Sequence, residues 1–423
     1  MSKFINFIKR QLYILKSKLW FNPLAYCILA ILAIYWCYLM QQLNIDFYST
    51  KINLDTVNSL LSIITTSMLA VIVFTVGAIV TAYNSASNSG TPRVLTILFR
   101  DKASHKATSN FIGAFIYGVV ATVGIKSGVF NGTGIFLIFL ITIFVFAWVI
   151  FTFIIWIDDI AKLGQVRTLL TKTEKQAFNA VKKYTNNPYL GCNALDENSI
   201  PTNSTPIFAQ DYGFLNDILF ESLNSLCKEL DAKLYIVKYK GEHLASTETL
   251  AFIECSKDLP NEKLAEIANH FIISNEKNFI EDPVFGLETL SEIAAKALSP
   301  STNDPTTAIN VIDTLNRCLK YLFDSSFKDK KVIYENLYIK DISIERFIKS
   351  SFEYIRIYGS SNLLVAKRIQ KSLLHISKQA NKENSKVIEK YMENCYTQAN
   401  VELTYNFEKT ELNEFIKSLK VQK

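Results

Sequence analysis

Four long apolar runs near the start of the chain constrain its fold more than any other feature. They occupy about residues 22–40, 56–83, 107–125 and 134–157. A helix needs about 20 residues to cross the hydrocarbon core of a bilayer, and each run has about that length or more. A helix also satisfies its own backbone hydrogen bonds in lipid, which an irregular segment cannot do. We therefore expect a four-span transmembrane domain over residues 1–160.

The composition fits a chain divided between membrane and water. Hydrophobic residues make up 49% of the 423 residues, which is high for a wholly soluble protein, while 20% are charged. The formal net charge of +6 is spread along the chain, with no basic block interleaved with aromatic residues. That distribution argues against nucleic acid as a partner and favours the lipid bilayer.

The positive charges predict the orientation of the spans. Lysine and arginine are dense before the first run and between the second and third, whereas Lys51 and Lys126 are the positive residues of the two opposite loops. Loops rich in positive charge stay on the cytoplasmic side. The first run has Trp36 near its far end and no small-residue cleavage site, so we expect a retained span rather than a signal peptide. Both termini are then cytoplasmic.

The second run carries a stripe of small and polar residues at helical spacing. It contains no acidic or basic residue that would mark an ion or proton route. Small hydroxylated residues let helices pack closely and hydrogen-bond across an interface. The alternative is that this face lines a water-filled path. The stripe and candidate pore-lining set consists of Ser59, Ser62, Thr66, Ala70, Val73, Gly77, Thr81 and Asn84.

Three neighbouring segments have simpler interpretations. Residues 93–106, with Arg93, Arg100, Lys102 and Lys106, are basic and partly amphipathic, which favours a position along the membrane surface. The third run contains Ala114 and Gly118, a small-xxx-small pair suited to close helix contact. The fourth run is apolar on all sides and rich in aromatic residues, so we expect it to face lipid.

From about residue 161 the composition becomes that of a soluble protein. We expect a helical linker over 161–205, a small α/β subdomain over 206–260 and a mainly helical subdomain over 261–423. Alternating apolar residues predict strands at 206–209, 233–239 and 249–255, with one further candidate strand in VIYENLYI. The expected fold is an α-helical membrane protein with four transmembrane helices plus a large, mainly helical α+β cytoplasmic domain. Its expected helices are 166–184, 215–230, 262–271, 283–298, 305–323, 344–358, 362–379, 385–396 and 403–419.

Cysteine and histidine usage gives no sign of a metal site or a disulfide framework. The seven cysteines form no CxxC pair, and the four histidines lie far from one another and from the cysteines. Such scattered cysteines are typical of reduced thiols. The chain also lacks a phosphate-cradling glycine loop, GxSxG and HExxH. We expect no metal, no cofactor and no enzymatic activity.

The most distinctive stretch, EDPVFGLETLSEIAAKALSPSTNDPTTA, predicts two helices joined by a tight corner. The first helix stops at Ser299, because a residue that precedes a proline is disfavoured in the α region. Asp304 followed by Pro305 is typical of a new helix start. The candidate residues of this motif are Asp282, Gly286, Ser299, Pro300, Asn303, Asp304, Pro305 and Thr306.

The polar residues of this stretch have two interpretations. Carboxylates such as Asp282 and Asp304 could bind a divalent cation or act as acid and base. The structural alternative makes Asp304 an N-cap, has Asn303 brace the turn, and leaves Glu288 and Glu292 on a solvated face. Arg346, further along the chain, is expected to be solvated or to lie between subunits.

The chain resembles the DUF2254 family of prokaryotic predicted membrane proteins over nearly its whole length. The resemblance rests on the four spans, SASNSGTPRVLTILFRD after the second, NFIGAFIYG in the third, and DYGFLNDI. The most specific match is to the family pattern DPxFGLxxLxxIAxxALSPxxNDPxTA. Asn84, Asn88 and Gly90–Thr91 stand where the family more often has a Gln/Ser-Phe-Ser/Gly-type run. The resemblance implies a prokaryotic inner-membrane location and brings no known activity.

These observations support two hypotheses of different classes. In the first, the protein is a homo-oligomeric channel or transporter for small ions or solutes, in which the second span lines the path and the cytoplasmic domain assembles and regulates. In the second, it is a membrane-anchored cytoplasmic sensor or scaffold without transport, in which the Asn303–Asp304 corner places a ligand or subunit contact. A third, an enzyme that uses the carboxylates of Asp282 and Asp304, has the weakest support.

Overall fold

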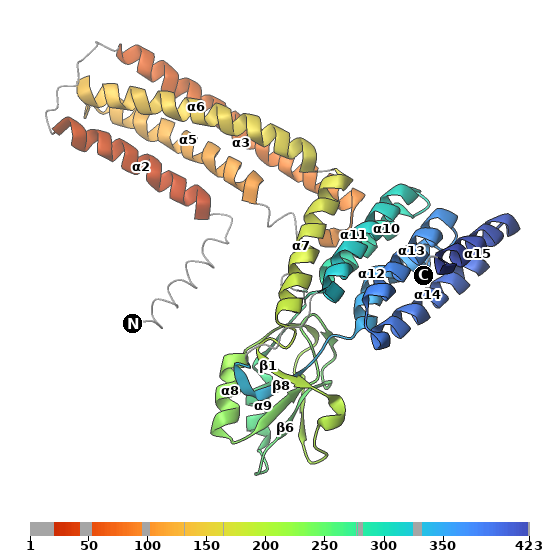
Figure 1. The fold of residues 1–423 in the computed structure, drawn as a ribbon. Helices are drawn as coiled ribbons and strands as arrows, with labels where there is room; N and C mark the ends of the chain where they lie inside the picture. The colour runs from red at the N-terminus through yellow and green to blue at the C-terminus, as the bar shows by residue number, and fades with distance from the viewer. Residues whose placement is uncertain are drawn as a thin grey trace. The chain divides into compact units, whose positions relative to one another are not determined.

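The computed structural model describes residues 21–42, 53–94, 102–130, 132–163, 165–275, 277, 282–324 and 332–421. Figure 1 shows the chain coloured from its N-terminus to its C-terminus. The chain divides into two compact units. The first unit comprises Met1–Asn88 and Leu98–Thr168, and the second comprises Ser89–Ile97 and Leu169–Lys423.

Four long helices make up the first unit, and all four are long and apolar enough to cross a membrane. Each covers one of the predicted spans and extends a few residues beyond it, so the prediction of four apolar helices is confirmed. Residues 95–101, the centre of the predicted surface segment, lie outside the described residues. The helices are α2 (Phe21–Gln42), α3 (Leu54–Ser89), α5 (Lys102–Lys126) and α6 (Gly132–Leu163).

Small residues allow the helices of this bundle to approach closely. A Cβ added to Gly113 of α5 would lie 2.7 Å from the Cβ of Tyr26 on α2, so the two backbones leave no room for a side chain there. Gly118 of α5 lies in the same way against Thr65 of α3. Close contact through small residues is the usual way in which membrane helices associate, because lipid offers no hydrophobic drive between them.

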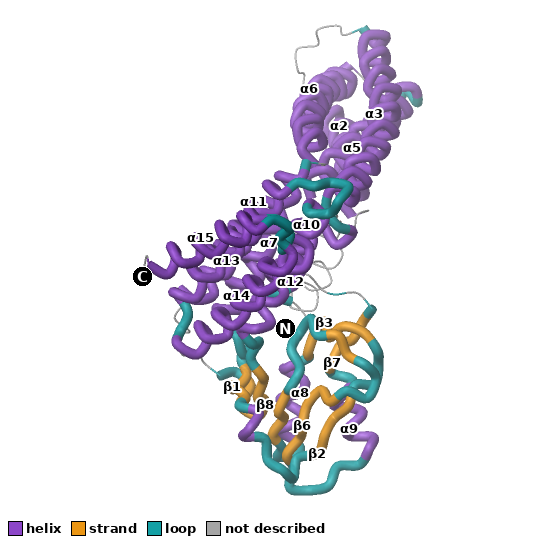
Figure 2. The backbone as a smooth tube through the Cα atoms, turned by 90° about the vertical axis from the view of Figure 1, so that its right-hand side faces the viewer, coloured by secondary structure: helices purple, strands orange, loops and turns teal. Residues whose placement is uncertain are grey.

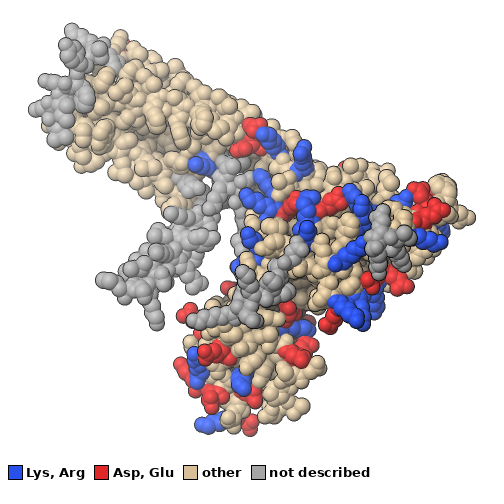
Figure 3. Space-filling view, in the orientation of Figure 1, with Lys and Arg blue, Asp and Glu red and all other residues tan. Residues whose placement is uncertain are grey.

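Helix α6 packs on one face only, whereas its sequence is apolar on every side. Its face toward the bundle buries Ile138 and Trp156, and the hydroxyl of Tyr117 on α5 lies 2.9 Å from that of Thr142. The opposite face exposes large side chains such as Phe144 and Ile154. In the orientation of Figure 3 the surface of these helices is almost free of charged residues, as lipid contact requires.

The second unit combines helices with two small sheets. Helix α7 (Val166–Asn186) leads into it, and α8 and α9 accompany the strands. Helices α10–α15 form a helical layer (Figure 2), in which α10 packs on α11 and α12, and α13 packs on α11 and α14. The further helices are α8 (Phe220–Glu229), α9 (Asn261–Ala268), α10 (Phe285–Ala297), α11 (Pro305–Asp324), α12 (Ile344–Gly359), α13 (Leu363–Gln379), α14 (Lys382–Glu402) and α15 (Asn406–Val421).

The larger sheet has five strands in the order β1-β8-β4-β6-β2, and the smaller has three in the order β5-β3-β7. Strand β8 pairs in parallel with both β1 and β4, whereas β6 pairs antiparallel with β4 and β2. A short 3₁₀ helix, Glu197–Ser199, follows the first strand. The strands are β1 (Cys192–Leu195), β2 (Thr205–Phe208), β3 (Gly213–Ile218), β4 (Lys233–Ile236), β5 (His243–Leu244), β6 (Thr249–Glu254), β7 (Phe271–Ser274) and β8 (Tyr334–Lys340).

Most predicted elements of the second unit are present, and three predictions were wrong in part. Strand β1 lies in the stretch 161–205 predicted to be a helical linker, and it is held by parallel pairing with β8 rather than by any alternation of its own. Strand β3 takes the start of a predicted helix, because residues 213–218 pair with β5 and β7. Strand β7 begins at Phe271, where a helix was expected to end.

The sheets also bear on how the second unit is organised. The five-stranded sheet takes β1 from before residue 206 and β8 from beyond residue 260, so its strands come from all three predicted segments. This mixing places distant parts of the chain around one core. The division at residues 160, 205 and 260 stays a prediction.

Candidate functional site

The predicted stripe on α3 faces away from the other three helices. All eight of its residues, Ser59, Ser62, Thr66, Ala70, Val73, Gly77, Thr81 and Asn84, are exposed. The opposite face of α3 buries apolar side chains, among them Leu61, Ile64 and Met68. The outward face of α3 therefore mixes these hydroxyl and amide groups with exposed apolar side chains such as Ile63 and Phe74. In lipid the apolar side chains are favourable and the polar groups are not.

Part of the polarity of α3 is satisfied within the helix. The hydroxyl of Thr75 donates to the carbonyl of Val71 at 2.6 Å, and that of Thr81 donates to the carbonyl of Gly77 at 2.9 Å. Such bonds lower the cost of a hydroxyl in lipid. A Cβ added to Gly77 would meet nothing within 4 Å, so the outer face is open around this residue.

The corner between α10 and α11 is held by caps, as the structural alternative predicted. Asp304 accepts hydrogen bonds from the N–H of Thr307 at 3.0 Å and from its hydroxyl at 2.5 Å. Its own N–H donates to the carbonyl of Ala297 at 2.7 Å. Asn303 has a φ of 45°, a left-handed conformation in which asparagine is among the better-tolerated residues. Ser299, whose hydroxyl donates to the carbonyl of Lys296, completes the turn.

The motif's glycine has a packing role. A Cβ added to Gly286 on α10 would lie 2.7 Å from both the Cα and the Cβ of Ala177 on α7. Helices α7 and α10 therefore cross with their backbones almost in contact. Of the other motif residues, Pro300 and Thr306 are exposed at the corner, and Pro305 is half-buried as the first residue of α11.

The two motif aspartates do not share a site. Asp282 precedes α10 and Asp304 follows it, and a helix of 13 residues is about 20 Å long. Asp282 is 1% exposed and accepts from the N–H of Val284 at 2.9 Å. No group of three or more metal-binding side chains occurs within the described ranges.

Arg93, which follows α3 in sequence and belongs to the second unit, binds two glutamates of α10. Its Nη1 lies 3.1 Å from Glu288 and 2.6 Å from Glu292. Its guanidinium also lies over the ring of Phe285, 5.6 Å from the centroid. The prediction that Glu288 and Glu292 lie on a solvated face was therefore wrong: their side chains are 19% and 15% exposed.

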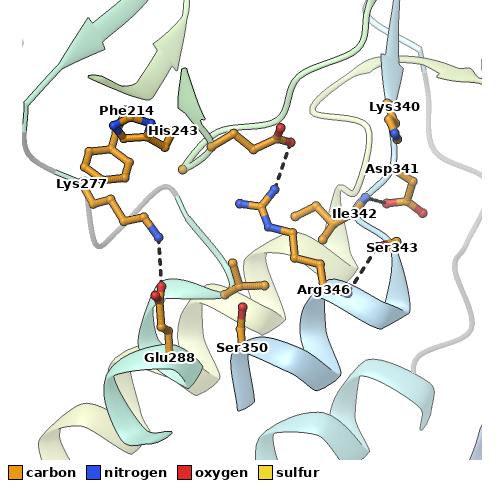
Figure 4. A pocket seen from close by; sticks show the side chains of 13 residues that line it. Phe214, His243, Lys277, Glu288, Lys340, Asp341, Ile342, Ser343, Arg346 and Ser350 are labelled. Carbon is orange, nitrogen blue, oxygen red and sulfur yellow. Dashed lines mark hydrogen bonds and ion pairs between the residues drawn. The ribbon is translucent and has the colours of Figure 1, made fainter. Parts of the chain in front are cut away.

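A cavity of about 440 Å³ lies beside these glutamates, within the second unit. Figure 4 shows Lys277 on one side and Arg346 on another, both pointing into the space between them. Lys277 lies 2.9 Å from Glu288 and 3.7 Å from the buried carboxylate of Asp282. Arg346 donates from Nη1 to Glu242 at 3.0 Å. Arg346, expected to be solvated or to lie between subunits, is 25% exposed and contacts the β4–β5 turn of its own chain.

The walls of the cavity come from both layers of the unit. The strand side supplies Phe214 and His243, whose rings are 4.9 Å apart, and β8 supplies Lys340. The helix side supplies the first turn of α12, where the hydroxyl of Ser343 accepts from the N–H of Arg346 at 3.3 Å. The cavity thus combines an aromatic wall, a helix N-terminus, three cationic side chains and three carboxylates, those of Glu242, Glu288 and Asp341. Lys340 also forms an ion pair with Glu197, which does not line the cavity.

The carboxyl groups of this region titrate according to their burial and partners. Burial raises the pKa of Asp282 above its ordinary value, although Lys277 opposes the shift. Burial likewise acts to raise the pKa of Glu288, but Lys277 and Arg93 outweigh it and hold that pKa below its ordinary value. Burial raises the pKa of Asp341, against a hydrogen bond from the hydroxyl of Tyr184. The pKa values of Asp282 and Asp341 are thus shifted upward, and that of Glu288 downward.

Sequence reasoning missed three residues of this site. Lys277 and Arg346 lie 69 positions apart and in no recognisable motif, so their approach follows only from the packing of the sheet on α10 and α12. Arg93 was assigned to a membrane-surface segment. One available signal was the spacing of Glu288 and Glu292, since two carboxylates one turn apart attract a cation.

Comparison with known proteins identifies the family of the chain. Residues 16–375 match the model of the family described as "Predicted membrane protein (DUF2254)". An uncharacterized protein of Mycobacterium bovis and one of Mycobacterium tuberculosis are each 25% identical over 135 residues, 31% of this chain and 26% of the relative. The match therefore spans about a quarter of these relatives' length. No solved structure matches the chain. Because the family model covers most of its residues, the chain belongs to the DUF2254 family of predicted membrane proteins.

Proposed function

We propose that this protein is a homo-oligomeric channel or transporter of the prokaryotic inner membrane, with both termini in the cytoplasm. In this proposal the outward face of α3 lines a path for a small ion or solute. The second unit is the cytoplasmic domain that assembles and regulates the oligomer.

The outward direction of the α3 stripe carries this proposal. Three of its residues, Ser59, Ser62 and Thr66, present hydroxyls on the exposed face of a helix whose other face is packed. Polar groups directed at lipid are unfavourable, whereas the same groups in a water-filled path or against another subunit are satisfied. Four spans alone enclose no such path, so a second copy of the chain supplies the other wall.

Bulky substitutions on this face test the proposal. The purified full-length protein is reconstituted in liposomes, and flux of small ions is followed with ion-sensitive dyes. We expect Thr66→Phe and Gly77→Phe to change the flux at least several-fold, because each places a ring in the path. Ile154→Phe is the control, since Ile154 is 63% exposed on α6, away from the stripe.

The outcome decides between conduction and simple packing. Equal flux in wild type, Thr66→Phe and Gly77→Phe, with the oligomer intact by native mass spectrometry, rejects the pore assignment. Loss of the oligomer in the α3 variants but not in Ile154→Phe assigns the stripe to a subunit contact instead.

The alternative function is a membrane-anchored sensor without transport, and the cavity of the second unit favours it. The cavity opens beside Glu288, which is also bound by Arg93 in the segment that directly follows α3. Under this alternative, wild-type liposomes conduct no better than empty ones. Ligand-dependent changes in the second unit would then be the activity.

A further inference from the structure

We propose that the cavity bounded by Lys277 and Arg346 binds a small organic phosphate, with its phosphate group between the two cations. This inference concerns a ligand of the second unit and does not depend on conduction by α3. It rests on the geometry of the cationic groups, on the balance of charge around them, and on the shape of the cavity.

The two cations converge on one space. Lys277 and Arg346 come from opposite sides of the cavity and direct their charged ends toward each other (Figure 4). Both are largely enclosed, since their side chains are 14% and 25% exposed. Like charges held near each other away from bulk water gain from an anion that bridges them, and phosphate accepts several hydrogen bonds at once.

The carboxylates that line the cavity also have hydrogen-bond or ion-pair partners other than Lys277 and Arg346. Glu288 also binds Arg93, and Glu242 also receives the N–H of Tyr239 at 2.9 Å and has Lys238 at 4.0 Å. Asp341 accepts from the N–H of Ile342 at 2.8 Å. An anion can therefore take a share of Lys277 and Arg346 while Glu288, Glu242 and Asp341 keep these partners, and the buried Asp282 keeps the N–H of Val284.

The start of α12 lies at the cavity wall. The helix begins at Ile344 after its N-cap Ser343, whose hydroxyl accepts from the N–H of Arg346, and both Ser343 and Arg346 line the cavity. A helix of 16 residues carries a partial positive charge at this end. Lys340, at the end of β8, lies on the same wall.

The volume and the apolar walls of the cavity indicate that the ligand has an organic part as well as a phosphate group. Its volume of about 440 Å³ falls in the range of small-molecule sites. Phe214, with His243 at its edge, and the side chains of Val284 and Ile342 provide aromatic and aliphatic walls. A phosphate monoester of about the size of a mononucleotide fits both the volume and the donors.

The site also has a physical connection to the segment after α3. Lys277 and Arg93 bind the same carboxylate group of Glu288 from two sides. When an anion draws Lys277 into the cavity, Glu288 is left to Arg93. Ligand binding should therefore strengthen the attachment of Arg93 to α10 and slow hydrogen exchange in residues 89–94.

Binding is tested on the full-length protein in detergent, with inorganic phosphate and adenosine monophosphate as probes. Titration calorimetry and hydrogen exchange are run at constant ionic strength, and adenosine serves as the uncharged control. We expect saturable binding of at least one phosphate probe, none of adenosine, and protection of the amides at the start of α12. Arg346→Gln and Lys277→Met should each weaken binding at least tenfold, while Arg346→Lys retains part of it.

Lys349→Gln is the matched control on α12, because Lys349 is 55% exposed, pairs with Glu345 on the same helix and does not line the cavity. It should bind like wild type. If neither probe binds at millimolar concentration, or if binding is unchanged in Arg346→Gln and Lys277→Met, the proposal is wrong. If Arg346→Gln misfolds, Lys340→Gln provides the test, with a smaller but measurable loss of affinity expected.

Discussion

Replacement of Gly286 by alanine would test the close crossing of α7 and α10 in the second unit. The added Cβ would lie 2.7 Å from two carbon atoms of Ala177. Favourable carbon–carbon contacts lie at about 3.5–4.0 Å, so the helices must separate by about 1 Å or distort. Overpacking of this kind costs about 1–3 kcal/mol.

Helix propensity acts in the opposite direction and must be subtracted. Alanine is about 1 kcal/mol more favourable than glycine inside a helix. The expected net loss is therefore about 0–2 kcal/mol. Lys296 is exposed on the same helix, so the difference between Lys296→Ala and Lys296→Gly measures the propensity contribution in α10 itself. The clash energy is the loss in Gly286→Ala plus that difference.

The measurement is hydrogen exchange of the α7 and α10 amides in the full-length protein in detergent, which reports local opening free energies. A thermal unfolding scan accompanies it. Ala177→Gly combined with Gly286→Ala should recover part of the loss, because it removes one of the two clashing atoms. A Gly286→Ala variant that is more stable than wild type by the full propensity difference would show that the two helices are not in contact and would refute the reasoning.

Three further predictions concern the motif corner and the segment after α3. Asp304→Ala should lower the local stability of α11 by about 1 kcal/mol through loss of the N-cap. Hydrogen bonds from Thr307 hold the pKa of Asp304 below its ordinary value. The stability difference between wild type and Asp304→Ala should therefore be full at neutral pH and shrink as the pH falls through that lowered pKa. Hydrogen exchange at several pH values measures it. Asn303→Gly should be tolerated while Asn303→Val should cost about 1–2 kcal/mol, because a branched residue is strained at a φ of 45° and the denaturation midpoint would show it. Arg93→Gln should lower the stability of the second unit by about 1 kcal/mol, a value limited by the 39% exposure of the side chain. The variant should also be easier to cleave by protease at residues 89–94. Unchanged cleavage would contradict the ion pairs with α10.

Local patterns in the sequence were sufficient to predict the helices and the tight corner between α10 and α11. The four apolar runs, the Ser299–Pro300 stop and the Asp304–Pro305 start depend on neighbours within a few residues, and all were predicted. Most strands with clear alternation, such as β4 and β6, were predicted as well. In these cases the physical cause lies within one element, so a single sequence contains it.

Features that depend on distant pairing could not be read in the same way. Strand β1 has only four residues and exists because β8 lies beside it, and neither alternation nor composition marks it. The cavity needs Lys277, Arg346 and β3 to meet after the sheet has packed on α10 and α12. Arg93 looked like a membrane-surface charge because its partners lie in a different part of the sequence.

The ion pairs of Arg93 have a consequence for biosynthesis. Its partners Glu288 and Glu292 are synthesised about 200 residues later, which at about 5–20 residues per second takes roughly 10–40 seconds. During that interval α5 and α6 are synthesised, while the docking surface for this arginine does not yet exist. Attachment of residues 89–94 to α10 is therefore a late step in maturation, one that a truncated or stalled chain never reaches.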